Sequence, residues 1–351
     1  MRRREFIGSA LALAAMPAIR VVGEEIGAVV PLKVGILGGT HSHGLAKAKA
    51  LLASTDWNVV GIHEPDEKVR GRYEELGLKA VSQEELLEQS EVIVIESEVK
   101  DHYRHAKIAL SAEKHVHLEK PPAETLAEFQ ELQILSVANK KLMQMGYMWR
   151  FNPGINAALE AAAKGYLGAV YLVRAEINKL VIREERGEWN MRGGTMFELG
   201  CHVIDPVVRL LGRPENVTTH LKTSGGENDR ITDNTVAVFD YPTATAIVTS
   251  SILHPGGARH RHLHLYGSNG TALVKPIEQP VLEIEVDRDA GPYKKGRQII
   301  KFPKYERYTP EFKELAACIR EKRSLGITPE NDLLVQQTLL RACGVAEPGT
   351  N

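Results

Sequence analysis

The stretch Lys114-His-Val-His-Leu-Glu-Lys-Pro121 is the most informative part of this chain for the fold. It is typical of a short buried strand that carries Lys120 to its carboxyl end, where Pro121 stops the strand. Ligands of open α/β sheets bind at the carboxyl ends of the strands. We therefore expect Lys120 to face a substrate or cofactor. The alternative is a lysine exposed to solvent after a strand.

The residues on both sides of this stretch alternate between strand and helix. We expect strands at 33–37, 58–63, 79–81, 91–95 and 143–147, and helices at 45–54, 67–76, 83–88, 102–112 and 126–139. Strands that are regularly separated by helices predict a parallel, doubly wound sheet, and hence an α/β fold.

The second half of the chain has a different pattern. Strands are expected at 169–178, 217–223, 235–241, 244–250, 262–266 and 281–286, and closing helices at 310–322 and 331–343. Strands that follow one another without helices favour a large, mostly antiparallel sheet. One broad face of such a sheet needs another cover, so we expect a homo-oligomer, either a dimer or a tetramer.

The turn after the first strand is a candidate dinucleotide site. It runs Gly38-Gly39-Thr40-His41-Ser42-His43, and Glu64 ends the next strand. A carboxylate there accepts hydrogen bonds from a ribose 2′-OH and repels a 2′-phosphate, which favours NAD over NADP. Thr40 and His43 stand where the Gly-x-Gly-x-x-Gly fingerprint has glycine. A purely structural strand–helix turn is therefore the alternative.

A second group of candidate catalytic residues lies in the segment 193–205. Glu198 and His202 are four residues apart, so on an α-helix they share one face, and Asp205 is within reach. A carboxylate beside an imidazole raises its pKa and fixes its tautomer, as general acid–base catalysis requires. The alternative is a solvated Glu–His pair on an amphipathic helix.

The stretches Ala106–Pro121 and Gly146–Pro153 resemble the Gfo/Idh/MocA family, the relatives of glucose–fructose oxidoreductase and inositol dehydrogenase. The resemblance implies a Rossmann domain, here 31–150, and a C-terminal α/β domain with a large, mostly antiparallel sheet, here 151–345. It also implies NAD(P)-dependent oxidation or reduction of sugars, cyclitols and related polyols. In the family an aspartate precedes the catalytic histidine by four residues. His202 matches that histidine, and Glu198 stands in place of the aspartate.

The expected chemistry is hydride transfer. His202 would take the proton of a substrate hydroxyl, Lys120 would donate to the same oxygen, and Glu198 and Asp205 would orient His202. Substrate contacts are expected from Lys120, Arg150, Trp189, Arg192 and His202, although interdomain packing is the alternative for Arg150, Trp189 and Arg192. Cofactor contacts are expected from Gly38, Gly39, Thr40, His41, Ser42, His43, Glu64, Ser97, His102, Glu119, Lys120 and Arg150.

Two other functions stay open. One is glycoside cleavage with transient NAD oxidation, and the other is sugar binding without catalysis after loss of the nucleotide. Glu96 and Glu98 weigh against dinucleotide binding, because carboxylates beside an anionic pyrophosphate are unfavourable unless they point away.

Residues 1–30 are predicted to be an export segment outside the fold. Arg3-Arg4-x-Phe6-Ile7 before an apolar run resembles a twin-arginine signal, which predicts a periplasmic protein. A membrane tether that is not cleaved, or a wrongly assigned start, is the alternative; in the latter case the protein would be cytoplasmic. The body of the chain has no apolar run of about twenty residues, so no further membrane association is expected.

The composition, the cysteines and the remaining histidines limit which partners and metals are expected. The net charge of −1 gives no basic excess, so no nucleic acid partner is expected. The three cysteines are far apart and indicate neither a disulfide framework nor a zinc site. No metal is predicted at His260, His262 and His264, which alternate along one strand, nor at His41 and His43.

Overall fold

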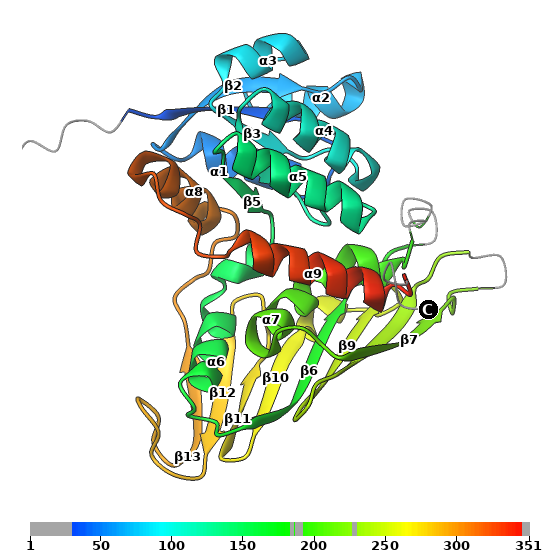
Figure 1. Ribbon diagram of the computed structural model, residues 1–351, viewed down its shortest axis with the longest axis vertical. Helices are drawn as coiled ribbons and strands as arrows, with labels where there is room; N and C mark the ends of the chain where they lie inside the picture. Colours follow the sequence, from blue (N-terminus) through cyan, green and yellow to red (C-terminus); the bar gives the residue numbers. More distant parts are fainter. Residues whose placement is uncertain (1–29, 183–185, 187–191, 227–229, 346–351) are drawn as a thin grey trace, which may run out of the picture. The chain divides into compact units, whose positions relative to one another are not determined.

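The computed structural model describes residues 30–182, 186, 192–226 and 230–345. It contains a five-stranded, all-parallel sheet in the order β2-β1-β3-β4-β5 (Figure 1). Its strands are β1 (Leu32–Leu37), β2 (Trp57–His63), β3 (Val92–Ile95), β4 (His115–Leu118) and β5 (Met143–Met145). Every residue of β3 is buried, as expected for a central strand with both faces covered.

Helices connect these strands, as the sequence predicts. They are α1 (Gly44–Leu52), α2 (Glu67–Glu74), α3 (Gln83–Gln89), α4 (Val99–Ser111) and α5 (Leu126–Ala138). Side-chain caps fix several starts: Asp66 accepts two backbone N–H bonds at α2, and Thr125 and Glu128 form a capping box at α5. The predicted strand at 79–81 is only an isolated bridge between Ala80 and Ile62.

The register of the sheet brings the candidate residues together. Leu37, Ile95 and Leu118 are paired across β1, β3 and β4, so these strands end side by side. The residues that follow, from Gly38, Glu96 and Glu119 onward, therefore lie along one edge of the sheet. Lys120 is delivered to this edge, and its peptide bond to Pro121 is cis.

The second sheet has eight strands in the order β13-β12-β11-β10-β6-β9-β8-β7. Only β6 and β9 pair in parallel, and the other neighbours are antiparallel. The strands are β6 (Val170–Asn178), β7 (Asn216–Lys222), β8 (Asn234–Asp240), β9 (Thr245–Ser251), β10 (His262–Gly267), β11 (Gly270–Val274), β12 (Val281–Val286) and β13 (Gly296–Lys301). The mostly antiparallel sheet is the one expected from the sequence.

Helices pack on one face of this sheet. α6 (Pro153–Ala163) contacts β10 to β12, α7 (Cys201–Leu211) contacts β6 and β9, and α9 (Pro329–Ala342) contacts β7 (Figure 1). α8 (Thr309–Glu321) contacts α1 instead. Along β8 and β9 every second residue is buried, which separates a helix-covered face from an open one.

Several elements differ from the sequence predictions. α6, β11 and β13 were not predicted, although Asn152 caps α6 and Pro153 occupies its first turn, both recognisable signals. Residues Met196–Gly200 form a π-helical turn ahead of α7 instead of a plain α-helix. No helix within the described ranges is long and apolar enough to cross a membrane. The predicted export segment and Trp189 lie outside the described residues.

Candidate active site

Lys120 is the centre of the candidate site. Its side chain is 1% exposed, and its ammonium lies 2.7 Å from Glu198 Oε1 and donates to the Glu198 carbonyl oxygen at 3.1 Å. Burial alone would lower the pKa of Lys120, but the Glu198 carboxylate keeps it above its usual value. An ammonium carries three hydrogens. With these two acceptors the described residues leave one donor for a ligand.

His202 lies in the same buried region. Its ring is 5.4 Å from the Trp149 ring and 6.1 Å from the His43 ring, between centroids. Burial and the charge of Lys120 hold the pKa of His202 well below its usual value. Its Nδ1 is buried without a hydrogen-bond partner among the residues described. The lowered pKa favours the neutral form of the His202 imidazole.

Glu198 has a different partner from the one expected. Its carboxylate pairs with Lys120, and in the described structure no ion pair joins it to His202. The four-residue spacing assumes an α-helix, whereas Glu198 lies in the π-helical turn, which changes the side-chain directions. Burial would raise the pKa of Glu198, but Lys120 lowers it to about 2, so the carboxylate stays ionised.

Asp205 does not orient His202 either. It accepts from Arg150 Nε at 2.9 Å and pairs with Arg150 Nη2 at 2.7 Å, and Asp332 of α9 pairs with the same Nη2 at 2.5 Å. All three side chains are buried. Arg150 is thus held between two carboxylates, which corresponds to the packing alternative and not to a substrate contact.

Arg192 is exposed and lies near Cys343, the residue after α9. No contact of Arg192 with Lys120 or His202 occurs in the described part of the chain. Trp189 has no described position.

The first turn borders a pocket at the carboxyl ends of β1, β2 and β3. Gly38 has φ +78°, and a Cβ there would lie 2.7 Å from the Ser97 Cα, so this turn requires glycine. Gly39 N–H donates to Glu64 Oε2 at 2.7 Å. The pocket is lined by Gly38, Thr40, His63, Glu64, Pro65, Asp66, Gln83, Ser97, Glu98, Asp101, Arg104 and His105.

This pocket is a candidate for the adenosine side of a dinucleotide. It lies where such ligands bind in doubly wound sheets, and Glu64 is in its wall at the end of β2. Thr40 and Ser42 are both exposed, but only Thr40 lines this pocket. His102 serves another purpose, because its Nδ1 lies 2.7 Å from Pro121 O and its Nε2 3.0 Å from Ser97 O. It links α4 to the loops that carry Lys120 and Ser97.

A buried charge network lies behind the first turn. The ammonium of Lys47 donates to Glu96 Oε1 at 2.9 Å, contacts His117 Nε2 at 2.8 Å and pairs with Glu119. Glu96 therefore points into the protein and not toward the pocket. Lys47 was not predicted as a site residue. It could have been found because it lies on the buried stripe of α1 with Gly44, Ala48 and Leu51.

His41 and His43 also point inward. His41 Nε2 lies 3.6 Å from Glu198 Oε1 and 3.9 Å from Glu119 Oε1, and His43 Nδ1 lies 3.2 Å from Glu119 Oε1. Burial lowers the pKa of His43 to about 4. The turn thus adds two imidazoles to the carboxylates beside Lys120.

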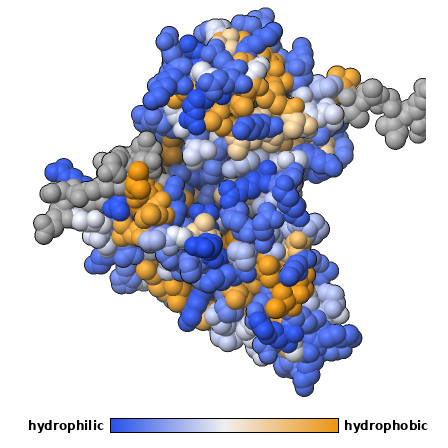
Figure 2. All heavy atoms as spheres, turned by 180° about the vertical axis from the view of Figure 1, so that it is seen from behind, coloured by the Kyte–Doolittle hydropathy of each residue, from blue (hydrophilic) through white to orange (hydrophobic). Residues whose placement is uncertain are grey.

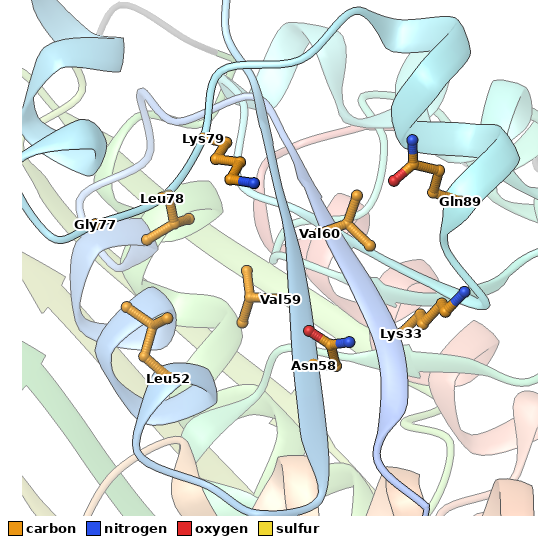
Figure 3. A pocket seen from close by; sticks show the side chains of 9 residues that line it. All are labelled: Lys33, Leu52, Asn58, Val59, Val60, Gly77, Leu78, Lys79 and Gln89. Atoms are coloured by element: carbon orange, nitrogen blue, oxygen red, sulfur yellow. The ribbon is translucent and has the colours of Figure 1, made fainter.

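Another pocket lies along the edge strand β2 (Figure 3). None of the predicted site residues is among its lining residues, which are Lys33, Leu52, Asn58, Val59, Val60, Gly77, Leu78, Lys79 and Gln89.

Comparison with known families identifies both halves of the chain. Residues 32–147 match "Oxidoreductase family, NAD-binding Rossmann fold", and residues 155–273 match "GFO/IDH/MocA C-terminal domain". Together these matches cover about two thirds of the chain. The chain belongs to the Gfo/Idh/MocA family. The precise domain limits 31–150 and 151–345 remain a prediction.

Individual Gfo/Idh/MocA relatives are distant. The chain is 32% identical over 146 residues to the uncharacterized oxidoreductase C26H5.09c of Schizosaccharomyces pombe, covering 40% of this chain and 39% of that protein. It is 26% identical over 221 residues to glucose-6-phosphate 3-dehydrogenase of Bacillus subtilis, covering 60% and 62%. The chain thus matches roughly half the length of these curated relatives.

Solved structures share the fold over nearly their whole length. GenD2 from gentamicin A biosynthesis, solved in complex with NAD, superimposes with a TM-score of 0.75 at 19% identity, covering 95% of this chain and 97% of that one. This likeness concerns the fold.

Proposed function

We propose that this protein is an NAD-dependent oxidoreductase that transfers a hydride between nicotinamide and the hydroxyl-bearing carbon of a sugar, cyclitol or polyol. The observation that carries the proposal is the pair formed by Lys120 and His202. Lys120 keeps one donor hydrogen, and the buried Nδ1 of His202 has no partner among the described residues. A donor and a proton acceptor within one buried site suit a substrate hydroxyl.

Each residue then has a defined task. His202, being neutral, accepts the hydroxyl proton, and Lys120, being cationic, stabilises the negative charge that develops on the same oxygen. Glu198 positions the ammonium of Lys120. A bound nicotinamide supplies the hydride acceptor.

The charge of the pocket supports NAD over NADP. Four carboxylates, from Glu64, Asp66, Glu98 and Asp101, line it, against Arg104 as the permanent cation. Glu98, unlike Glu96, is thus in the pocket wall, which disfavours a pyrophosphate placed beside it. A 2′-phosphate would be repelled there, whereas a ribose hydroxyl can donate to Glu64.

Nucleotide content and turnover test this proposal. Mass spectrometry of the denatured protein should reveal bound NAD, and absorbance should show NADH when sugars and polyols are added with NAD. Lys120→Ala should abolish that turnover. No turnover in the wild type, or unchanged turnover in Lys120→Ala, would contradict the proposal. Sugar release without net NADH would favour glycoside cleavage, and absence of nucleotide would favour a binding protein.

The open face of the eight-stranded sheet supports a homo-oligomer. Val238 and Ile247 are paired across β8 and β9, and both lie half-buried on the face opposite the helices. Figure 2, a view from behind, shows hydrophobic patches among hydrophilic residues in this part of the molecule. We infer that a second copy covers this face. Sedimentation should show a dimer or tetramer.

The N-terminal sequence supports export to the periplasm. Arg3-Arg4-x-Phe6-Ile7 and the apolar run after it have the order of a twin-arginine signal. Fractionation of cells in which Arg3 and Arg4 are both replaced by Lys tests this proposal. Retention in the cytoplasm is expected, and continued export would contradict it.

A further inference from the structure

The two histidines of the first turn and two glutamates form a compact set of possible metal ligands. Their atoms are separated by 3.2 Å (His43 Nδ1 to Glu119 Oε1), 3.6 Å (His41 Nε2 to Glu198 Oε1) and 3.9 Å (His41 Nε2 to Glu119 Oε1). Ligands at about 2.0–2.2 Å from a tetrahedral zinc ion are about 3.3–3.6 Å from one another. Ligand atoms of His41, His43 and Glu119 all lie within 4.8 Å of one another, close to the size of a zinc site, and Glu198 lies beside His41 as a possible fourth ligand.

His41 points into this set and lacks a hydrogen bond there. The residue is 9% exposed, and its Nε2 is buried without a partner among the described residues. Glu198 Oε2 is likewise buried and unpartnered. Unpaired buried polar atoms are unfavourable, and an ion that accepts lone pairs from both would satisfy them.

The surroundings also provide support for such ligands. His41 Nδ1 accepts the His43 N–H at 3.3 Å and lies 3.8 Å from Glu96 Oε2, a buried oxygen with no hydrogen-bond partner among the described residues. Metal-bound histidines commonly direct their other nitrogen to a carboxylate. Lys47 holds both Glu96 and Glu119 from the opposite side, which fixes the carboxylates in place.

We propose that His41, His43, Glu119 and Glu198 bind one divalent transition-metal ion of the zinc type. Two imidazoles and two carboxylates are an ordinary donor set for such an ion. No metal is predicted at His41 and His43 from the sequence, because they are separated by one residue and both glutamates come from distant segments. The site shares Glu198 with Lys120, whose ammonium donates to Glu198 Oε1 at 2.7 Å, so the metal would draw on the unpartnered Oε2. Its existence does not depend on the proposed hydride transfer.

Metal titration of the full-length protein tests the site. The protein is treated with a chelator, returned to chelator-free buffer and titrated by calorimetry with Zn²⁺ alone, without nucleotide. One tight equivalent is expected, and Co²⁺ should give the visible absorption of a tetrahedral site. His43→Gln should weaken Zn²⁺ binding by at least about tenfold, the lower end of losses caused by supporting groups.

A matched control removes a histidine elsewhere. His220 is exposed on β7, so His220→Gln should bind Zn²⁺ like the wild type. Zn²⁺ should also raise the melting temperature of the wild type and of His220→Gln but not of His43→Gln, which checks that each variant is folded. Absence of saturable Zn²⁺ binding, or binding that persists in both His43→Gln and His41→Gln, would overturn the proposal.

Discussion

At the scale of single residues, Lys47 shows how much one buried charge can matter. It is fully buried and pairs with both Glu96 and Glu119. Lys47→Met leaves two buried carboxylates without their cation, so we expect the free energy of unfolding to fall by about 3–5 kcal/mol. Urea unfolding measures this loss. Lys49→Met, an exposed change on the same helix, should have little effect, and equal stability of the two variants would contradict the account.

His115 gives the fold a dependence on pH. Burial and the neighbouring Lys141 lower its pKa to about 4, and its Nδ1 accepts the Leu142 N–H at 3.0 Å. The folded state therefore favours the neutral ring. Its contribution to stability is present above the unfolded pKa of about 6.5 and is lost as the pH falls toward 4.

His115→Asn should reduce this dependence, because Asn keeps an acceptor for Leu142 but does not titrate. Denaturant unfolding between about pH 7 and pH 4.5 should show a smaller loss of stability than in the wild type. His220→Asn, at an exposed position, should leave the loss unchanged. An identical pH dependence in His115→Asn and wild type would show that His115 does not contribute.

At the scale of elements, local sequence patterns predicted the helices and strands better than the contacts between residues far apart in the sequence. The strand ending before Lys120 and the alternating helices follow from runs of apolar residues and turn signals, and the structure contains them. The partners of Glu198 and Asp205 could not be predicted this way. A π-helical turn changes the side-chain directions at Glu198, and Asp332, more than a hundred residues further along, shares Arg150 with Asp205. Spacing along one segment contains no information on such contacts.

The turn after β1 provides a prediction at the same scale. Gly38 has φ +78° and abuts the Ser97 backbone, whereas Gly77 has φ +91° with open space around it. Gly77→Ala therefore adds backbone strain of about 1–2 kcal/mol, and Gly38→Ala adds the same strain plus a steric clash. Urea unfolding should show Gly38→Ala to be the less stable variant. Equal stabilities of Gly38→Ala and Gly77→Ala would mean that the turn after β1 and the turn after β3 are not closely packed.

At the scale of the whole molecule, the open sheet face predicts how copies associate. Ile247 lies on it between Val238 of β8 and Arg174 of β6. If a second copy covers this face, Ile247→Glu places a charge in the interface and should shift the oligomer toward monomers in sedimentation. A wild type that is already monomeric, or an oligomer unaffected by Ile247→Glu, would exclude this face as the interface.

The proposed function depends on two residues from separate segments, Lys120 after β4 and His202 on α7, acting on one substrate oxygen. The most direct measurement is kcat/KM for NADH formation by His202→Asn with the best substrate of the wild type. Loss of the proton acceptor should lower it by at least about 100-fold. Turnover equal to that of the wild type would contradict the assignment of His202 as the base.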